Sequence, residues 1–197
     1  MQALERKHET RPMIARKPAL HEFEYIRHGT LALIASFGVA TGRILAASVG
    51  PTRTEADFAR HIETVIAIDP EATWVFVVDQ LNTHKSEALV RLVARHCDIK
   101  QELGTKGKSG ILQSMPSRAV FLSCTDHRIR FVYTPKHTSW LNQIEIWFSI
   151  LVRKVLRRGN FVSKAALKQQ IEAFIAYFNE TMARAFKWTY KGRPLQV

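Results

Sequence analysis

A short run of five apolar residues, Trp74–Val78, constrains the fold of this chain more than any other stretch. Polar residues bound it on both sides, a pattern typical of a strand that is covered on both faces by helices. Asp79 stands at the carboxyl end of this strand, followed by a polar segment through Ser86. Ligand sites in open α/β sheets lie beyond the carboxyl ends of strands, so Asp79 is a candidate functional residue.

A second constraint comes from residues 134–156, where a polar loop containing a proline leads into an amphipathic helix. Its apolar stripe at steps of three and four consists of Leu141, Ile144, Phe148, Leu151 and Val155. Glu145 interrupts the pattern at the margin of this stripe, where a carboxylate is costly unless a cation meets it. Asn142 lies one turn earlier and can aim its amide at the same point, or it can act as the N-cap of the helix.

The remaining sequence predicts strands and helices in an order that defines the fold class. Strands are expected over residues 30–39 and 43–49 as a hairpin, and over 129–133. Helices are expected over 55–68, after Ser86, over 111–123 with an interruption near Pro116, and over 164–182. The expected N-caps are Thr54 for the first of these helices, Ser86 or Thr83 for the second and Ser163 for the last. Residues 1–22 contain two prolines and are expected to be irregular. No internal repeat is present, so the 197 residues predict one mixed α/β domain.

The charge balance points to an anionic partner. Lysine and arginine number 29 against 17 acids, which gives a net charge of +12, and ten cations against two acids lie from Arg153 to the end. Such an excess is most often a footprint of nucleic-acid binding. The candidate phosphate contacts are Lys85, Lys136, His137, Arg153, Arg157 and Arg158.

Several other classes of protein are disfavoured. The two cysteines, Cys97 and Cys124, have no metal-ligand spacing and indicate free thiols in the cytoplasm. The first residues lack the apolar core of a secretory signal, and no apolar run reaches the length of a membrane span. Residues 104–108 lack the spacing of a nucleotide-binding phosphate loop.

Asp79 and Glu145 together suggest a metal site. Two carboxylates in one cleft suit Mg²⁺ or Mn²⁺, because hard cations prefer oxygen ligands. Two such ions ~4 Å apart can activate a water or hydroxyl and stabilise a leaving 3′-oxygen in phosphodiester chemistry.

At these residues the chain resembles a known family. It is similar to bacterial insertion-sequence transposases in three segments. They are the strand that ends in Asp79 with the following LNTHKS, the segment YTPKHTSWLNQIEIWF, and the basic tail ending in KWTYKGRP. These form the mariner-like branch of the DDE transposase and retroviral-integrase superfamily, with a ribonuclease H-like mixed sheet and helices on both faces. The resemblance implies that Asp79 is the second acid, Glu145 the third, and that Asn142 orients groups beside two metal ions. It also implies cleavage at transposon ends, transfer of the freed 3′-hydroxyl to target DNA, and a place at the bacterial nucleoid.

The chain departs from this family in two respects. Between Asp79 and Glu145 lie 65 residues, a long gap in which 98–127 resemble an insertion. The first acid of the family should end a central strand just upstream of a segment like QALERKH, and here that segment follows Met1 directly. Without this strand, two sheet edges keep unpaired backbone groups. We therefore expect a truncated, marginally stable domain that cannot catalyse alone and that a homodimer or a full-length transposase could complement.

Two other functions remain open. One is a non-catalytic, DNA-binding remnant of a transposase, and the other is a ribonuclease H-like nuclease acting on RNA–DNA hybrids. Of the other side chains, His84 and His137 are expected to be surface polar groups, and Trp140 and Trp147 core or loop anchors. For Trp188 and Tyr190 the sequence supports packing on the core and contact with DNA equally.

Overall fold

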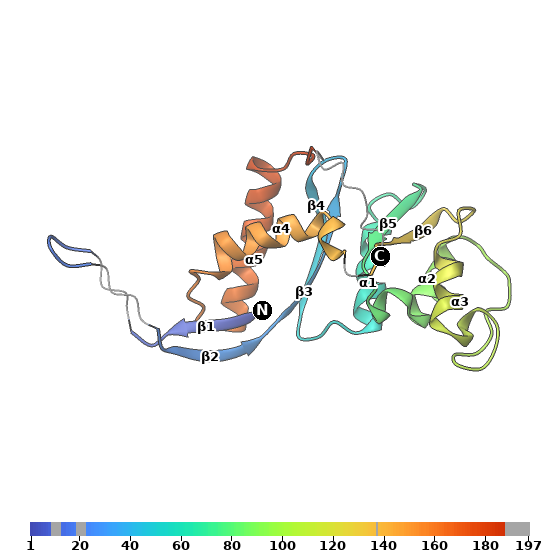
Figure 1. Ribbon diagram of the computed structural model, residues 1–197, viewed down its shortest axis with the longest axis horizontal. Helices are drawn as coiled ribbons and strands as arrows, with labels where there is room; N and C mark the ends of the chain where they lie inside the picture. Colours follow the sequence, from blue (N-terminus) through green and yellow to red (C-terminus); the bar gives the residue numbers. More distant parts are fainter. Residues whose placement is uncertain (9–12, 19–22, 137, 188–197) are drawn as a thin grey trace, which may run out of the picture.

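The computed structural model describes residues 1–8, 13–18, 23–136 and 138–187. The molecule is elongated, with the β1–β2 ribbon at one end, β5, β6 and α1–α3 at the other, and the β3–β4 hairpin between them (Figure 1). The strands are β1 (Gln2–Arg6), β2 (Tyr25–Thr30), β3 (Ala32–Gly38), β4 (Arg43–Gly50), β5 (Trp74–Val78) and β6 (Ile129–Tyr133). The helices are α1 (Glu55–Ile66), α2 (Glu87–His96), α3 (Met115–Leu122), α4 (Ile144–Leu151) and α5 (Lys164–Thr181). Single turns complete the fold: η1 (Asn82–Lys85), η2 (Ile111–Gln113), η3 (Ser139–Leu141) and the π-helical η4 (Val152–Leu156).

The strands form three separate pairs. β1–β2 and β3–β4 are antiparallel, and β5–β6 is parallel with Trp74 opposite Ile129. The predicted α/β class is confirmed, but the described strands do not join into one mixed sheet, because none of them bridges β3 and β5.

The β1 strand is a difference from the sequence prediction, which made residues 1–22 irregular. Gln2–Arg6 pairs with β2 along one edge. Along the other edge, the Phe161 amide donates to the carbonyl of Leu4 at 2.8 Å, and the Arg6 amide donates to Asn160 Oδ1 at 2.7 Å. The polar sequence of β1 carries little strand signal of its own, so partners distant in the chain determine its conformation.

The β3–β4 hairpin is covered on both faces, as its alternating side chains require. Ile34 and Ser36 face α1, and Ser36 Oγ lies 2.9 Å from the imidazole of His61 on that helix. Leu33 and Phe37 face the opposite way and pack into the cluster formed by α4 and α5, whose centre is the fully buried Trp147.

The largest core cluster lies between β5–β6 and helices α1–α3. Thr54 caps α1 through a capping box with Asp57, as the sequence predicts for this helix start. Leu112 and Leu122 are fully buried in the cluster, so the segment that resembles an insertion is part of the core. Ser114 caps α3, and this cap divides the predicted helix over 111–123 into η2 and α3.

The prediction that β5 is covered on both faces is wrong. Trp74 and Phe76 pack on the core cluster, whereas Val75 is 45% exposed and Val77 is 47% exposed. Helices α1 and α2 bury only one face of the β5–β6 pair, because α4 and α5 pack on the β3–β4 hairpin instead.

Candidate active site at the carboxyl end of β5

Asp79 follows β5 directly and is held by two donors. Its Oδ1 accepts the Leu81 amide at 3.0 Å and lies 2.8 Å from His84 Nδ1. The His84 ring packs against the Phe58 ring at a centroid distance of 4.3 Å with the planes tilted by 40°, and its side chain is only 14% exposed. Burial lowers the pKa of His84, and the neighbouring Asp79 opposes that shift. The prediction that His84 is a surface group is therefore wrong, because η1 turns its ring inward.

A second set of contacts joins the carboxyl ends of β5 and β6. The Gln80 amide donates to the Thr134 carbonyl at 2.6 Å and accepts from Lys85 Nζ. The same ammonium lies 4.8 Å from the centre of the Tyr133 ring, whose hydroxyl donates to the His84 carbonyl at 2.9 Å. Burial raises the pKa of Tyr133 and keeps it a neutral donor. The Lys85 side chain is thus turned toward the protein in this structure.

Asn142 connects α4 to β5. Its side-chain Nδ2 donates to the backbone carbonyl of Val77, two residues before Asp79, at 3.4 Å. The backbone carbonyl of Asn142 accepts the Glu145 amide at 3.0 Å. Gln143 occupies the N-cap position without a side-chain hydrogen bond, while Asn142 Oδ1 accepts the Ile144 amide at 3.4 Å. Asn142 therefore makes a cap-like contact and also fixes the start of α4 beside the end of β5.

Glu145 lies in the first turn of α4 and is exposed. The predicted apolar stripe packs into the α4–α5 cluster through Ile144, Phe148, Leu151 and Val155, and Glu145 is exposed beside it. A carboxylate in the first helical turn is favoured by the helix dipole. No lysine or arginine within the described residues forms an ion pair with Glu145, so its carboxylate remains accessible to other cations.

The donor set has the chemistry of a hard-cation site but is small. Asp79 Oδ2, Glu145 and the Asn142 amide are oxygen donors of the kind that Mg²⁺ and Mn²⁺ prefer. Within the part of the chain that the structure describes, no group of three or more His, Cys, Asp or Glu side chains could hold a metal ion. Asn142 thus links the segments that carry Asp79 and Glu145, but the described residues by themselves do not form a metal site.

Of the other predicted phosphate contacts, Lys136 follows Thr134, which bonds to Gln80 beside Asp79, and the three arginines lie in or directly after η4. Lys136, Arg153, Arg157 and Arg158 are exposed, and His137 lies outside the described residues, as do Trp188 and Tyr190. Arg153 belongs to the π-helical turn η4, which closes with an Arg157 amide donating to Val152 at 2.8 Å. Trp147 is a core anchor as predicted, whereas Trp140 is 50% exposed.

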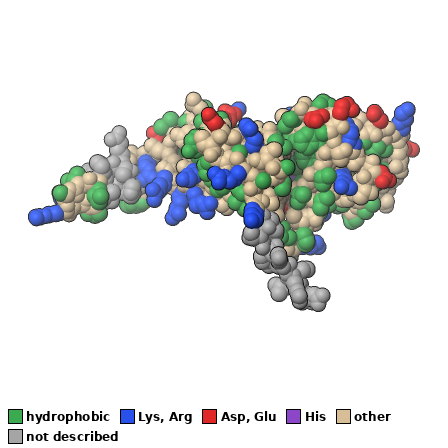
Figure 2. All heavy atoms as spheres, turned by 90° about the horizontal axis from the view of Figure 1, so that it is seen from above, with side chains coloured by type: hydrophobic (Ala, Val, Ile, Leu, Met, Phe, Trp, Pro, Cys, Tyr) green, Lys and Arg blue, Asp and Glu red, His purple; other side chains and the backbone are tan. Residues whose placement is uncertain are grey.

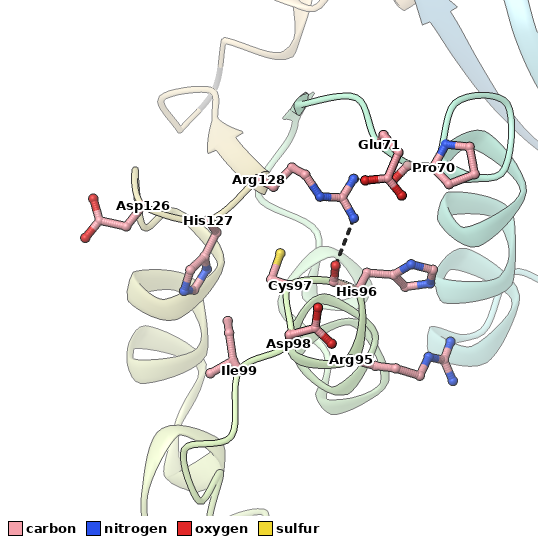
Figure 3. A pocket seen from close by; sticks show the side chains of 10 residues that line it. All are labelled: Pro70, Glu71, Arg95, His96, Cys97, Asp98, Ile99, Asp126, His127 and Arg128. Carbon is pink, nitrogen blue, oxygen red and sulfur yellow. Dashed lines mark hydrogen bonds between the residues drawn. The ribbon is translucent and has the colours of Figure 1, made fainter.

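A cavity of about 470 Å³ lies at the opposite, amino ends of β5 and β6, and none of the predicted site residues lines it (Figure 3). Arg128 extends across it and donates to the carbonyls of Pro70, Ala72 and His96. These bonds tie the starts of both strands to the end of α2, so the guanidinium has a structural role.

The end of β5, which carries Asp79, therefore lies beside the start of α4, which carries Asn142 and Glu145. A family model described as DDE superfamily endonuclease matches residues 5–168, which include Asp79, Asn142 and Glu145. The match covers most of the chain, so the chain belongs to this family of transposase-like nucleases. Neither a curated protein nor a solved structure matches it. No described helix is both long and apolar enough to cross a membrane.

Proposed function

We propose that this chain is the catalytic domain of a bacterial insertion-sequence transposase of the mariner-like branch, acting on chromosomal DNA at the nucleoid. Asp79 and Glu145 supply two carboxylates of its active site, and Asn142 positions groups between them. The reaction is hydrolysis at transposon ends followed by attack of the freed 3′-hydroxyl on target DNA. The contact from Asn142 to the Val77 carbonyl carries this proposal, because it joins the two acid-bearing segments across 65 positions of the chain.

His84 has a positioning role in this proposal. Its ring is fixed between Phe58 and Asp79, and it occupies Asp79 Oδ1 together with the Leu81 amide. Oδ2 is left as the oxygen available to a cation. A carboxylate oriented by hydrogen bonds loses less rotational freedom when it binds.

The proposed cofactor is Mg²⁺ or Mn²⁺, in a two-ion site when the ligand set is complete. Bound ions would lower the pKa of an attacking water and stabilise the negative charge that develops on the leaving oxygen. The oxygen donors of Asp79, Glu145 and Asn142 would hold them. The remaining steps, binding and orientation of DNA, fall to the cationic side chains.

We propose that the described residues are inactive alone, because two carboxylates are too few ligands for the metal ions of this reaction. Among the described strands β3 pairs only with β4 and β5 only with β6, so each keeps a free edge on which a further strand could pair. Met1 exchanges backbone hydrogen bonds with Leu31 at 2.6 and 2.8 Å, so a segment continuing upstream would run antiparallel along β3. Such a strand, carrying the third acid, could come from a longer form of this protein, a second copy or a full-length transposase.

The test is a comparison of three proteins with supercoiled plasmid and Mn²⁺. The first is the chain as it stands; the second carries an apolar strand ending in Asp before Met1; the third carries the same strand ending in Asn. We expect nicking only from the second, and Asp79→Asn in that background should abolish it. Mn²⁺ binding by electron paramagnetic resonance should weaken with Asp79→Asn and stay unchanged with the exposed control Glu102→Gln. Nicking that survives Asp79→Asn would refute the assignment of the site.

The second candidate function is a non-catalytic DNA-binding remnant. The small carboxylate set favours it, and it predicts salt-dependent DNA binding without nicking from any of the three proteins. A ribonuclease H-like nuclease would instead cleave RNA–DNA hybrids in preference to duplex DNA. Competition between the two substrates in the same assay separates these functions.

A further inference from the structure

Charge is distributed unevenly along the long axis of the molecule. Residues 1–8, 23–30 and 152–168 contain nine lysines and arginines against two carboxylates. Residues 55–100, which build α1, β5 and α2, contain five against eight. Figure 2 shows blue side chains gathered between the left-hand end of the molecule and its middle, whereas the opposite end carries red and blue side chains together. The first set of segments therefore carries more positive charge than α1, β5 and α2.

This surface is built from segments distant in sequence that the fold fixes together. The Arg6 amide donates to Asn160 Oδ1, which ties β1 to the connection between α4 and α5. The stem of Lys164 lies so close to Gly29 of β2 that a Cβ there would come within 3.2 Å of Lys164 Cδ. Arg27 lies two residues before Gly29 on β2. We call Arg27, Arg157, Arg158 and Lys164 the ribbon patch.

The cations of the ribbon patch are uncompensated. All four side chains are exposed, and no carboxylate of the described residues forms an ion pair with any of them. At the other end of the molecule, Arg91, Arg95 and Lys106 are each paired with a glutamate. A set of exposed, unpaired cations raises the local positive potential, and their mutual repulsion destabilises the fold unless an anionic partner neutralises it.

We infer that the ribbon patch is a binding surface for the phosphate backbone of duplex DNA, separate from the Asp79–Glu145 end. The choice of DNA as the polyanion rests on the proposed function. Arg157 and Arg158 lie in the connection between η4 and α5, and Lys164 is the first residue of α5. Arg27 lies on strand β2 of the two-stranded ribbon. Arginine suits phosphate because its planar fork can donate two hydrogen bonds to one group. The patch would hold a stretch of duplex beside the segment that is cleaved and add affinity without reading base sequence.

The test measures DNA binding without metal, so that it does not depend on catalysis. Fluorescence anisotropy with a labelled duplex would give affinity between 50 and 300 mM salt for Arg27→Gln/Lys164→Gln and for the charge-matched control Lys100→Gln/Lys108→Gln. Each lost phosphate contact should lower the slope of log affinity against log salt by about 0.9, and the affinity roughly tenfold near 0.1 M salt. We expect the slope of the patch variant to fall by about two and that of the control to remain near the wild-type value.

Three outcomes would overturn the inference. The first is an equal loss of DNA affinity in both variants, which would reflect net charge alone. The second is no loss of DNA affinity in the patch variant. The third is a loss of binding to phosphatidylglycerol vesicles that exceeds the loss for DNA, which would indicate a membrane-binding surface. Arg157→Gln/Arg158→Gln provides a second patch variant if the first does not fold. If the protein with the added strand ending in Asp does not nick DNA while the salt effect is intact, the proposed function is rejected and the ribbon patch is retained. Nicking with no effect at the patch would do the reverse.

Discussion

His61 should make the stability of this protein strongly dependent on pH. Its imidazole is 1% exposed and bridges the β3–β4 hairpin, with Nε2 2.9 Å from Ser36 Oγ and Nδ1 2.9 Å from Ser48 Oγ. Burial lowers the pKa of His61 from 6.5 to about 4, because a charged ring would lose its hydration. The neutral ring satisfies both hydroxyls, donating to one and accepting from the other.

The sign of the effect follows from the lowered pKa. The unfolded chain binds the proton more tightly than the folded one, so protonation favours unfolding. The contribution of His61 is fully present above pH 6.5 and is lost as the pH falls toward 4. With these two pKa values, the loss between pH 7.5 and 4.5 is about 2–3 kcal/mol.

Urea unfolding monitored by circular dichroism at several pH values would measure this loss. In His61→Leu, the free energy of unfolding should decline by about 2–3 kcal/mol less than in the wild type between pH 7.5 and 4.5. Val65→Ala lies on the same helix and removes buried volume without a titrating group, so it should shift stability equally at every pH. A constant difference between wild type and His61→Leu across this range would refute the reasoning.

Three further substitutions test the packing of the fold. Trp147→Ala removes a fully buried ring that contacts Phe178, and should cost about 3–5 kcal/mol of unfolding free energy in denaturant titrations. Gly42→Ala should lower the melting temperature, because Gly42 has a φ of 71° and an added Cβ would collide with the Arg184 backbone; an unchanged melting temperature would contradict this close approach. Arg128→Lys keeps the charge but cannot reach three carbonyls, so we expect a loss of about 1–3 kcal/mol in urea titrations, and wild-type stability would show that the bonds contribute little.

The candidate site illustrates which contacts local sequence can and cannot reveal. The apolar run of β5 and the polar residues after it identified Asp79, because a strand end is a local pattern. The sequence could not show that His84 turns back onto Asp79, since that contact depends on η1 and on Phe58 from α1. A histidine five residues after a strand-end acid was the available signal, but it is equally typical of a surface turn.

The sequence by itself determined the elements whose signals lie within one segment. Thr54, Ser86 and Ser163 cap their helices where the sequence predicts caps, since a cap needs only the residue and the next turn. Tertiary structure alone decided that a polar segment becomes β1, that Glu145 faces solvent and that one side of β5 is uncovered. In each of these cases the energy comes from groups far away in the chain, so pairing and burial outweigh local preference.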